Sequence, residues 1–281
     1  MMLFIVNPIS GNGRKLQIVT YLKKMGYKVV CTEYAGHGEI LAREASEEIV
    51  VAVGGDGTVN EVARGLAGTG RTLGIIPCGS GDGLALHLGI SRNFRKALKV
   101  IEAGKTRPMD AATVNGRHFF SVCGTGFDAI VSERFAASGK RGLMNYIVQA
   151  IRTWVAFTPE RYVVEIDGET LETEAAFITV GNSDQWGNRA RITPLADIGD
   201  GELDVTIVRM FRTWEIPWLA LRLMSGTAHK SGKTTCLRGK QVLIRRQTSG
   251  PAHADGDWFS DGELLDIKVF PHQFKVIVPK G

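Results

Sequence analysis

The stretch VGGDGTVNEV at positions 53–62 decides the fold class of the first third of this chain. It overlaps IVVAVGG (49–55), an apolar run of strand length, and leads into a helical pattern that ends near residue 68. A buried strand that passes through glycines into a helix is typical of a parallel α/β sheet. The glycines allow several backbone N–H groups to converge on one anion, and the helix adds its N-terminus. The stretch therefore predicts a phosphate-binding loop.

Asp56 lies in the middle of this loop, where a carboxylate would repel phosphate. The loop lacks the lysine of a Walker A loop and the glycine spacing of a Rossmann loop. An acid is compatible with bound phosphate when Mg²⁺ or a transferable proton lies between them. We therefore predict that Asp56 acts with a metal ion or beside a hydroxyl nucleophile. The structural alternative is that Thr58 and Glu61 form a T-x-x-E capping box at the start of the helix.

Two further glycine-rich segments follow strand-like runs. NPISGNG (7–13) comes after LFIV, and PCGSGDG (77–83) overlaps the end of TLGIIPCGS. Ligands of a parallel sheet bind outside the carboxyl ends of its strands, so three such clusters indicate one polar ligand site. For each segment taken alone, the alternative is an ordinary turn between strand and helix.

The periodicity changes near residue 110. Asn115-Gly116 and Asp167-Gly168 are strong hairpin signals, each between β-rich runs. Further β-rich runs follow, at 203–211, 240–246, 264–270 and 274–279. Two helical segments interrupt them, at 142–157 and 214–224. The sequence predicts an N-terminal parallel-sheet α/β nucleotide-binding domain (1–110) and a C-terminal, mostly antiparallel β-sandwich domain (111–270).

Acidic residues gather beside glycines in the second half. GTGFDA (124–129) places Asp128 near an expected helix start, where an acid also suits the helix dipole. ADGD (254–257) and SDGE (260–263) each carry two acids that share one face of an extended segment and could address one metal or proton. LADIGDGELD (195–204) is similar to a loop for a hard cation, although it is too short for an EF-hand. Solvated Asp-Gly turns are the structural alternative for the last three.

Composition limits the class of protein. A chain of 281 residues with 44% hydrophobic content suggests two domains and a core that needs no staple. The four cysteines lie far apart without C-x-x-C, which argues against a zinc site or a disulfide framework and favours a reducing compartment. The apolar run at the N-terminus is short, no basic region precedes it, and no run approaches the ~18 residues of a membrane span. We expect a cytoplasmic protein.

The net charge of +5 is compatible with nucleic acid, nucleotide phosphates or an anionic membrane. The basic residues are spread thinly, without a run of five, which argues against nucleic acid as a partner. Trp214 and Trp218 lie four apart on an expected helix, a spacing typical of core packing that also suits a membrane interface.

Taken in order, NPISG, GGDGTVNE, PCGSGDGLA, GTGFDA and the late DGD resemble the diacylglycerol kinase catalytic-domain family, which includes bacterial lipid kinases and sphingosine kinases. NAD kinases share a GGDGT loop, but the Asn60-Glu61 continuation and the order of the five segments favour the lipid kinases. The resemblance implies an α/β domain and a β-sandwich, with a final strand (about 271–281) that returns to the first domain. It also implies ATP- and Mg²⁺-dependent phosphate transfer to a lipid hydroxyl, and peripheral membrane contact; a homodimer is left open.

The resemblance assigns roles to single residues. Those expected at the ATP phosphates are Asn7, Ser10, Thr32, Gly54, Gly55, Asp56, Gly57, Thr58, Asn60, Gly79, Ser80 and Gly81. Those expected at the reacting groups are Asp255 as the catalytic base, Asp56, Asp128 toward the acceptor lipid or the catalytic Mg²⁺, and Asp257 where the family usually has Glu. Those expected at a structural Mg²⁺ are Asp197, Asp200 and Glu202, some of them through their backbone carbonyls.

Several alternatives stay open. The triplet at 255–257 is preferred to that at 261–263 for its distance to the closing FP…VP segment, and because Asp255 follows an extended approach whereas Asp261 is expected in a connecting turn. Asp82 replaces the usual Asn and would repel ATP phosphates unless it binds metal or turns away. The acceptor can be diacylglycerol, a sphingoid base or phosphatidylglycerol. Alternative functions are an NAD kinase and a non-catalytic nucleotide- or lipid-binding protein.

Overall fold

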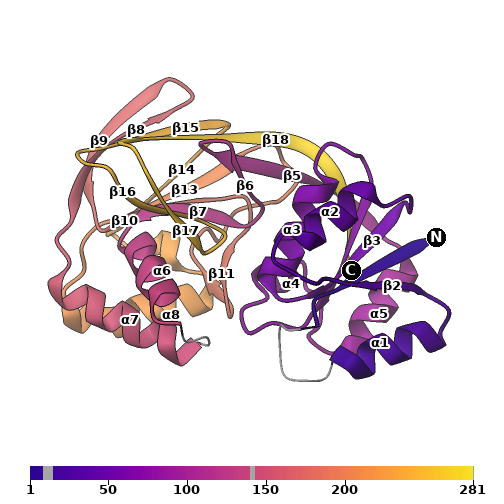
Figure 1. Ribbon diagram of the computed structural model, residues 1–281. Helices are drawn as coiled ribbons and strands as arrows, with labels where there is room; N and C mark the ends of the chain where they lie inside the picture. The colour runs from indigo at the N-terminus through magenta and orange to yellow at the C-terminus, as the bar shows by residue number, and fades with distance from the viewer. Residues whose placement is uncertain (9–14, 140–142, 281) are drawn as a thin grey trace. The chain divides into compact units, whose positions relative to one another are not determined.

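The computed structural model describes residues 1–8, 15–139 and 143–280 (Figure 1). The chain divides into two compact units, one formed by Met1–Ala111 with Pro271–Gly281 and the other by Ala112–Phe270. Each unit has its own hydrogen-bonded strands and is described separately.

The first unit is built on a parallel sheet. Its strands, in spatial order, are β2 (Lys28–Cys31), β1 (Met2–Val6), β3 (Ile49–Gly54), β4 (Thr72–Pro77) and the last part of β18 (Leu264–Ile277). Every neighbouring pair is parallel. Its helices are α1 (Lys15–Lys24), α2 (His37–Glu44), α3 (Asp56–Leu66), α4 (Gly83–His87) and α5 (Phe94–Ala103). Figure 1 shows α2 and α3 on one side of this sheet and α1 and α5 on the other, which explains why β1, β3 and β4 consist almost entirely of apolar residues.

The second unit is an antiparallel sandwich. One sheet has the order β14 (Thr234–Gly239), β13 (Leu203–Val208), β10 (Phe177–Gly181), β7 (Val122–Gly126), β16 (Gly250–Ala254) and β17 (Asp257–Asp261). The facing strands are the first part of β18, β15 (Gln241–Arg246), β8 (Glu160–Ile166) and β9 (Glu169–Ala175). Alternate residues such as Cys123, Ile178 and Val205 face a shared core with Val164 and Ile244.

A further hairpin pairs with β18: its strands are β5 (Thr106–Val114), which begins in the first unit and ends in the second, and β6 (Arg117–Phe119). The remaining elements of the second unit are β11 (Gln185–Gly187), β12 (Ala190–Arg191), α6 (Phe127–Ala137), α7 (Leu143–Ala156), α8 (Ile216–Ser225), and the 3₁₀ turns η1 (Thr213–Glu215) and η2 (Ala228–Lys230). A second apolar cluster, with Trp154 of α7 and Phe177 of β10 among its members, lies beneath α7 and α8.

The predicted fold class is confirmed in both units. The two hairpins predicted from Asn115-Gly116 and Asp167-Gly168 are present, with Val114 opposite Arg117 and Ile166 opposite Glu169. In the described ranges, no helix combines the length and apolar character needed to cross a membrane.

Candidate active site

Asp56 connects two of the glycine-rich loops in the first unit. It is the first residue of α3, and its two carboxylate oxygens accept hydrogen bonds from the backbone N–H groups of Asp82 (2.8 Å) and Gly83 (2.7 Å). Gly83 begins α4, so this carboxylate satisfies amides that the short helix leaves unpaired. Asp56 therefore fixes the 77–83 loop beside the 53–62 loop. Each oxygen keeps a further lone pair with which it can accept another donor or a cation.

The glycines allow these two loops to touch. A Cβ on Gly79 would lie 2.6 Å from the Cα of Gly55, and one on Gly81 would lie 2.6 Å from an oxygen of Asp56. A Cβ on Gly54 would collide with the side chain of Thr58. Gly57 differs, because it is exposed and nothing lies within 4 Å of the position of its Cβ. The open surface of this loop is thus at the first turn of α3.

The capping-box interpretation of Thr58 and Glu61 is wrong. The residue before α3 is Gly55, and the Glu61 carboxylate instead accepts the N–H groups of Gly36 (2.8 Å) and Gly38 (3.0 Å) at the start of α2. Thr58 is buried, and its hydroxyl has no hydrogen-bond partner among the described residues. Glu61 therefore holds α2 against α3, a long-range role that the local T-x-x-E spacing does not reveal.

Asp82 is turned away from solvent. Its side chain is 2% exposed, lies 3.0 Å from Nε of Arg92, and accepts the N–H of Gly79 at 2.8 Å. Arg92 also donates to the carbonyls of Ser80 and Gly81. Burial raises the pKa of Asp82, while the Gly79 hydrogen bond and Arg92 lower it. The predicted repulsion of phosphate is reduced because the carboxylate forms part of the loop's own scaffold.

The other predicted phosphate residues lie in the same unit, as far as the structure describes them. Asn7 follows β1, and its carbonyl accepts from Nζ of Lys15, a buried lysine whose pKa is lowered by burial. Thr32 follows β2, and Asn60 lies within α3; both are buried. Ser10 lies outside the described residues.

Asp255 forms the turn of a β-hairpin in the second unit. Asp255 and Gly256 join β16 to β17, with φ values of 52° and 86°. The Asp255 carboxylate accepts three backbone N–H groups, from Phe120, Ser121 and Val122, at 2.8–2.9 Å. The predicted extended approach is correct, because β16 is extended, but Asp255 itself is a turn residue.

Asp128 lies in the first turn of α6 and contacts β16, the strand that leads to this turn. Its side chain is 3% exposed, and Oδ2 lies 3.1 Å from both the Thr179 hydroxyl and Nε2 of His253. Gly124 provides the room, because a Cβ there would lie 2.5 Å from Asp128 Oδ2. Asp255 accepts the N–H of Val122, two residues before Gly124 on β7, so the carboxylates of Asp128 and Asp255 both lie beside this strand.

His253 is a polar residue that the sequence argument missed. It is buried, and its Nδ1 has no hydrogen-bond partner among the described residues. The sequence could have indicated it, because His253 lies two residues before Asp255 on an expected strand. In the structure it is on the side of β16 that faces away from the sandwich core.

The other late acids are less enclosed. Asp257 is the exposed first residue of β17. Asp261 is the last residue of β17 and not part of a separate turn, and it accepts from Asn115 Nδ2 (2.9 Å) and its neighbour Gly262 N (2.8 Å). The hydrogen bond from Asn115 lowers the pKa of Asp261.

The acidic loop at 195–204 contains a built-in cation. Arg238 of β14 pairs with Asp200, lies 3.3 Å from Glu202 and 3.4 Å from Asp204. Asp197 accepts the N–H of Gly199 instead. In residues 1–8, 15–139 and 143–280, no three His, Cys, Asp or Glu side chains are grouped to hold a metal ion. Arg238 therefore already pairs with the side chains of Asp200 and Glu202, so these two carboxylates do not fit a structural Mg²⁺ in this arrangement.

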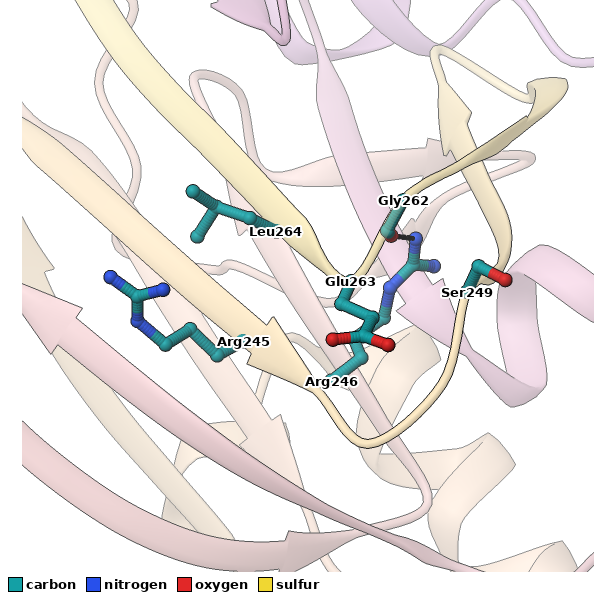
Figure 2. A pocket seen from close by; sticks show the side chains of 6 residues that line it. All are labelled: Arg245, Arg246, Ser249, Gly262, Glu263 and Leu264. Carbon is teal, nitrogen blue, oxygen red and sulfur yellow. Dashed lines mark hydrogen bonds between the residues drawn. The ribbon is translucent and has the colours of Figure 1, made fainter.

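A cavity of about 620 Å³ opens on the second unit at the end of β15 (Figure 2). Its lining residues are Arg245, Arg246, Ser249, Gly262, Glu263 and Leu264. Figure 2 shows the Arg246 guanidinium directed at Gly262, while Arg245 extends away from it. Arg246 also donates to Thr125 and to the carbonyls of Gly250, Pro251 and Asp261, so it joins the turns around the cavity. None of the predicted site residues lines this cavity.

Two family models match consecutive parts of the chain. The diacylglycerol kinase catalytic domain matches residues 1–114, and the YegS C-terminal NAD kinase beta sandwich-like domain matches residues 121–278. The second match alone spans more than half of the chain.

Individual proteins resemble the chain over nearly its full length. A diacylglycerol kinase of Bacillus subtilis is 26% identical over 98% of this chain and 95% of its own. A crystal structure of a candidate diacylglycerol kinase from Bacillus anthracis has a TM-score of 0.82 and 25% identity, covering 99% of this chain and 94% of that one. An NAD kinase from Archaeoglobus fulgidus, solved in complex with ATP, has a TM-score of 0.59 at 12% identity, over 100% of this chain and 94% of that chain. The last comparison shows a shared fold only.

Proposed function

Because the chain belongs to the diacylglycerol kinase catalytic-domain family and is a lipid kinase, we propose that it transfers the γ-phosphate of ATP to the hydroxyl of a membrane lipid with the help of Mg²⁺. The observation that carries this proposal is the loop around Gly57. It is exposed at the first turn of α3, with open space beside its backbone, while the neighbouring glycines are occupied by contacts between loops. Helix amides beside open space suit a phosphate group.

In this proposal the residues of the first unit hold ATP. Gly54 to Asn60 and Gly79 to Gly81 provide backbone N–H groups and short side chains for the phosphates. Asp56 fixes these two loops together and keeps lone pairs for a cation. Mg²⁺, when bound, neutralises the charge that develops on the transferred phosphoryl group.

Residues of the second unit handle the acceptor. Asp255 accepts the proton of the attacking hydroxyl, and Asp128 orients the acceptor with His253 as its neighbour. The three amides on Asp255 keep its carboxylate in one orientation, which suits a base that must meet a hydroxyl within about 3 Å or through one water. We assign the exposed Asp257, which directly follows the Asp255-Gly256 turn, to the same group of reacting residues. Asp197, Asp200 and Glu202 are not given a metal, because Arg238 already pairs with this loop.

The acceptor requires contact with a bilayer. A net charge of +5 favours an anionic surface, and we propose peripheral attachment in which electrostatic attraction is one part. That part should weaken as salt rises, because the Debye length falls from ~10 Å at 0.1 M to ~3 Å at 1 M.

Isotopically labelled ATP tests this function directly. The purified protein is incubated with Mg²⁺ and labelled ATP, once with mixed diacylglycerol, sphingoid base and phosphatidylglycerol, and once with NAD. We expect label in the organic phase only, and chromatography of that phase identifies the acceptor. Label on the dinucleotide would establish an NAD kinase instead, and no transfer to either would support a non-catalytic binding protein.

A further inference from the structure

Two helices of the second unit expose apolar side chains on their outer faces. On α7 these are Met144, Ile147, Ile151 and Val155; along η1 and α8 they are Trp214, Trp218, Leu221 and Met224. Val155 is 82% exposed and Trp214 is 70% exposed. The spacing of three or four residues places each set on one helix face. We call these eight residues the apolar surface.

The sides of the same helices that meet the protein are also apolar. Leu219 and Leu223 lie on the face of α8 opposite its exposed set, and Trp154 of α7 borders the exposed set of that helix; all three pack into the cluster around Phe177. A helix that is apolar on both its buried and its exposed side is typical of an element with a second apolar neighbour beyond the protein's own core. Since both helices contact one cluster, their outer faces belong to one side of this unit (Figure 1).

The charged residues near the apolar surface indicate which kind of partner it contacts. Neither α7 nor α8 contains an aspartate or glutamate. Over 143–156 and 212–225 there are three arginines, Arg152, Arg212 and Arg222, against one acid. That acid, Glu215, is paired with Lys233 at 2.6 Å. Apolar residues with tryptophans, flanked by arginines and without free carboxylates, match the interface of an anionic bilayer.

We propose that the apolar surface inserts into the interfacial layer of an anionic lipid bilayer and anchors the protein there. This inference rests on the proposed function, because a lipid substrate is what brings a kinase to a membrane. It assigns the anchoring to two helices of the second unit and to apolar insertion, in addition to general electrostatic attraction. Helices of this kind lie in the plane of the interface, with their apolar faces about 5–10 Å deep.

Sedimentation with vesicles tests the surface. We compare the wild type with Ile151→Asn/Val155→Asn and Trp214→Asn/Trp218→Asn, using vesicles of phosphatidylcholine with and without phosphatidylglycerol. Leu171→Asn is the matched control, since Leu171 is an exposed apolar residue of β9 in the same unit. We expect wild-type binding that is strengthened by phosphatidylglycerol and partly persists at ~1 M salt, where exposed charges are screened. Each double variant should lose about tenfold or more in partitioning, and the control should match the wild type.

Two further measurements separate this inference from its alternatives. Activity on a short-chain, water-soluble diacylglycerol should be unchanged in the double variants. If the wild type phosphorylates no lipid in any form, the proposed function fails independently of vesicle binding. Double variants that bind vesicles as the wild type does would overturn the inference. So would a wild-type oligomer, seen by sedimentation without lipid, that the double variants dissociate, because the surface would then be a contact between copies of the chain.

Discussion

The hairpins at Asp167-Gly168 and Asp255-Gly256 are built in the same way, yet only the second is assigned to chemistry. In both, the aspartate has a positive φ, 50° and 52°. In both, its carboxylate accepts backbone N–H groups of a neighbouring segment, from Lys240 and Gln241 in one case and from residues 120–122 in the other. In both, its own N–H donates to a carbonyl of that same segment. Amide-bound carboxylates are therefore a device by which Asp-Gly turns hold adjacent chain, and that geometry alone does not identify a base.

The surroundings distinguish the two turns. Asp255 and the buried Asp128 both lie beside strand β7, and His253, which contacts Asp128, lies two residues before Asp255. The Asp167 turn is exposed and follows β8 at the opposite sheet of the sandwich. Substitutions at these residues can show whether the difference in surroundings is also a difference in function.

The largest effect is expected at Asp56, a third aspartate whose carboxylate accepts backbone N–H groups. Asp56→Asn should reduce turnover to background while the fold survives, because Asn offers one oxygen where Asp56 serves two amides and retains lone pairs for a cation. Steady-state kinetics and circular dichroism on the purified variant provide the check. Near-wild-type activity would show that Asp56 is only a connection between loops.

The glycines at the phosphate loop allow a matched pair of substitutions. Gly79→Ala should destabilise the protein by about 1–3 kcal/mol, because its Cβ would meet the Gly55 backbone. Gly57→Ala should leave stability unchanged or raise it by about 0.5–1 kcal/mol, as Ala favours helix over Gly. We expect Gly57→Ala to raise KM for ATP, since its Cβ would enter the open space. Denaturant titration measures the stability of each variant, and steady-state kinetics measures its KM for ATP. An unchanged KM in Gly57→Ala would show that the phosphates do not bind at this turn.

Both hairpins should depend on their aspartates for stability. Asp255→Asn and Asp167→Asn each leave backbone amides short of an acceptor, so each should lower the free energy of unfolding by about 1–3 kcal/mol, less for the more exposed Asp167. Urea titration of the second unit's transition measures this. If only Asp167→Asn lowered the free energy of unfolding, the hydrogen bonds to Asp255 would not contribute to stability.

The smallest effect concerns the acidic loop. Arg238→Met should lower stability by about 1 kcal/mol, since the pairs with Asp200 and Glu202 are partly exposed and the buried Asp204, whose pKa burial raises to about 6, can bind a proton once its partner is lost. Millimolar Mg²⁺ should then raise the melting temperature of the variant more than that of the wild type, because the carboxylates have lost their internal cation. If Mg²⁺ raised the melting temperature of the wild type equally and saturably, this loop would be a metal site even with Arg238 present.

Local patterns predicted what depends on neighbours in sequence. Apolar runs joined to glycine clusters predicted the parallel sheet, and Asn115-Gly116 and Asp167-Gly168 predicted two hairpins. Partners far apart in sequence were not predictable in this way. Glu61 reaches Gly36, Arg238 reaches Asp200, and Asp128 meets His253 across 125 residues. Each of these pairs is fixed by the packing of elements that are far apart in the chain, which the local residue pattern does not contain.

The most direct test of the account compares kcat in the two hairpin variants. Asp255→Asn and Asp167→Asn are assayed with ATP and a lipid acceptor under conditions in which denaturant titration shows both to be folded. If Asp255 is the base, its variant should lose roughly 10²–10⁴-fold in kcat with little change in affinity for ATP, and Asp167→Asn should retain the wild-type rate. Equal rates in the two variants, or a larger loss in Asp167→Asn, would contradict the assignment of Asp255 to catalysis.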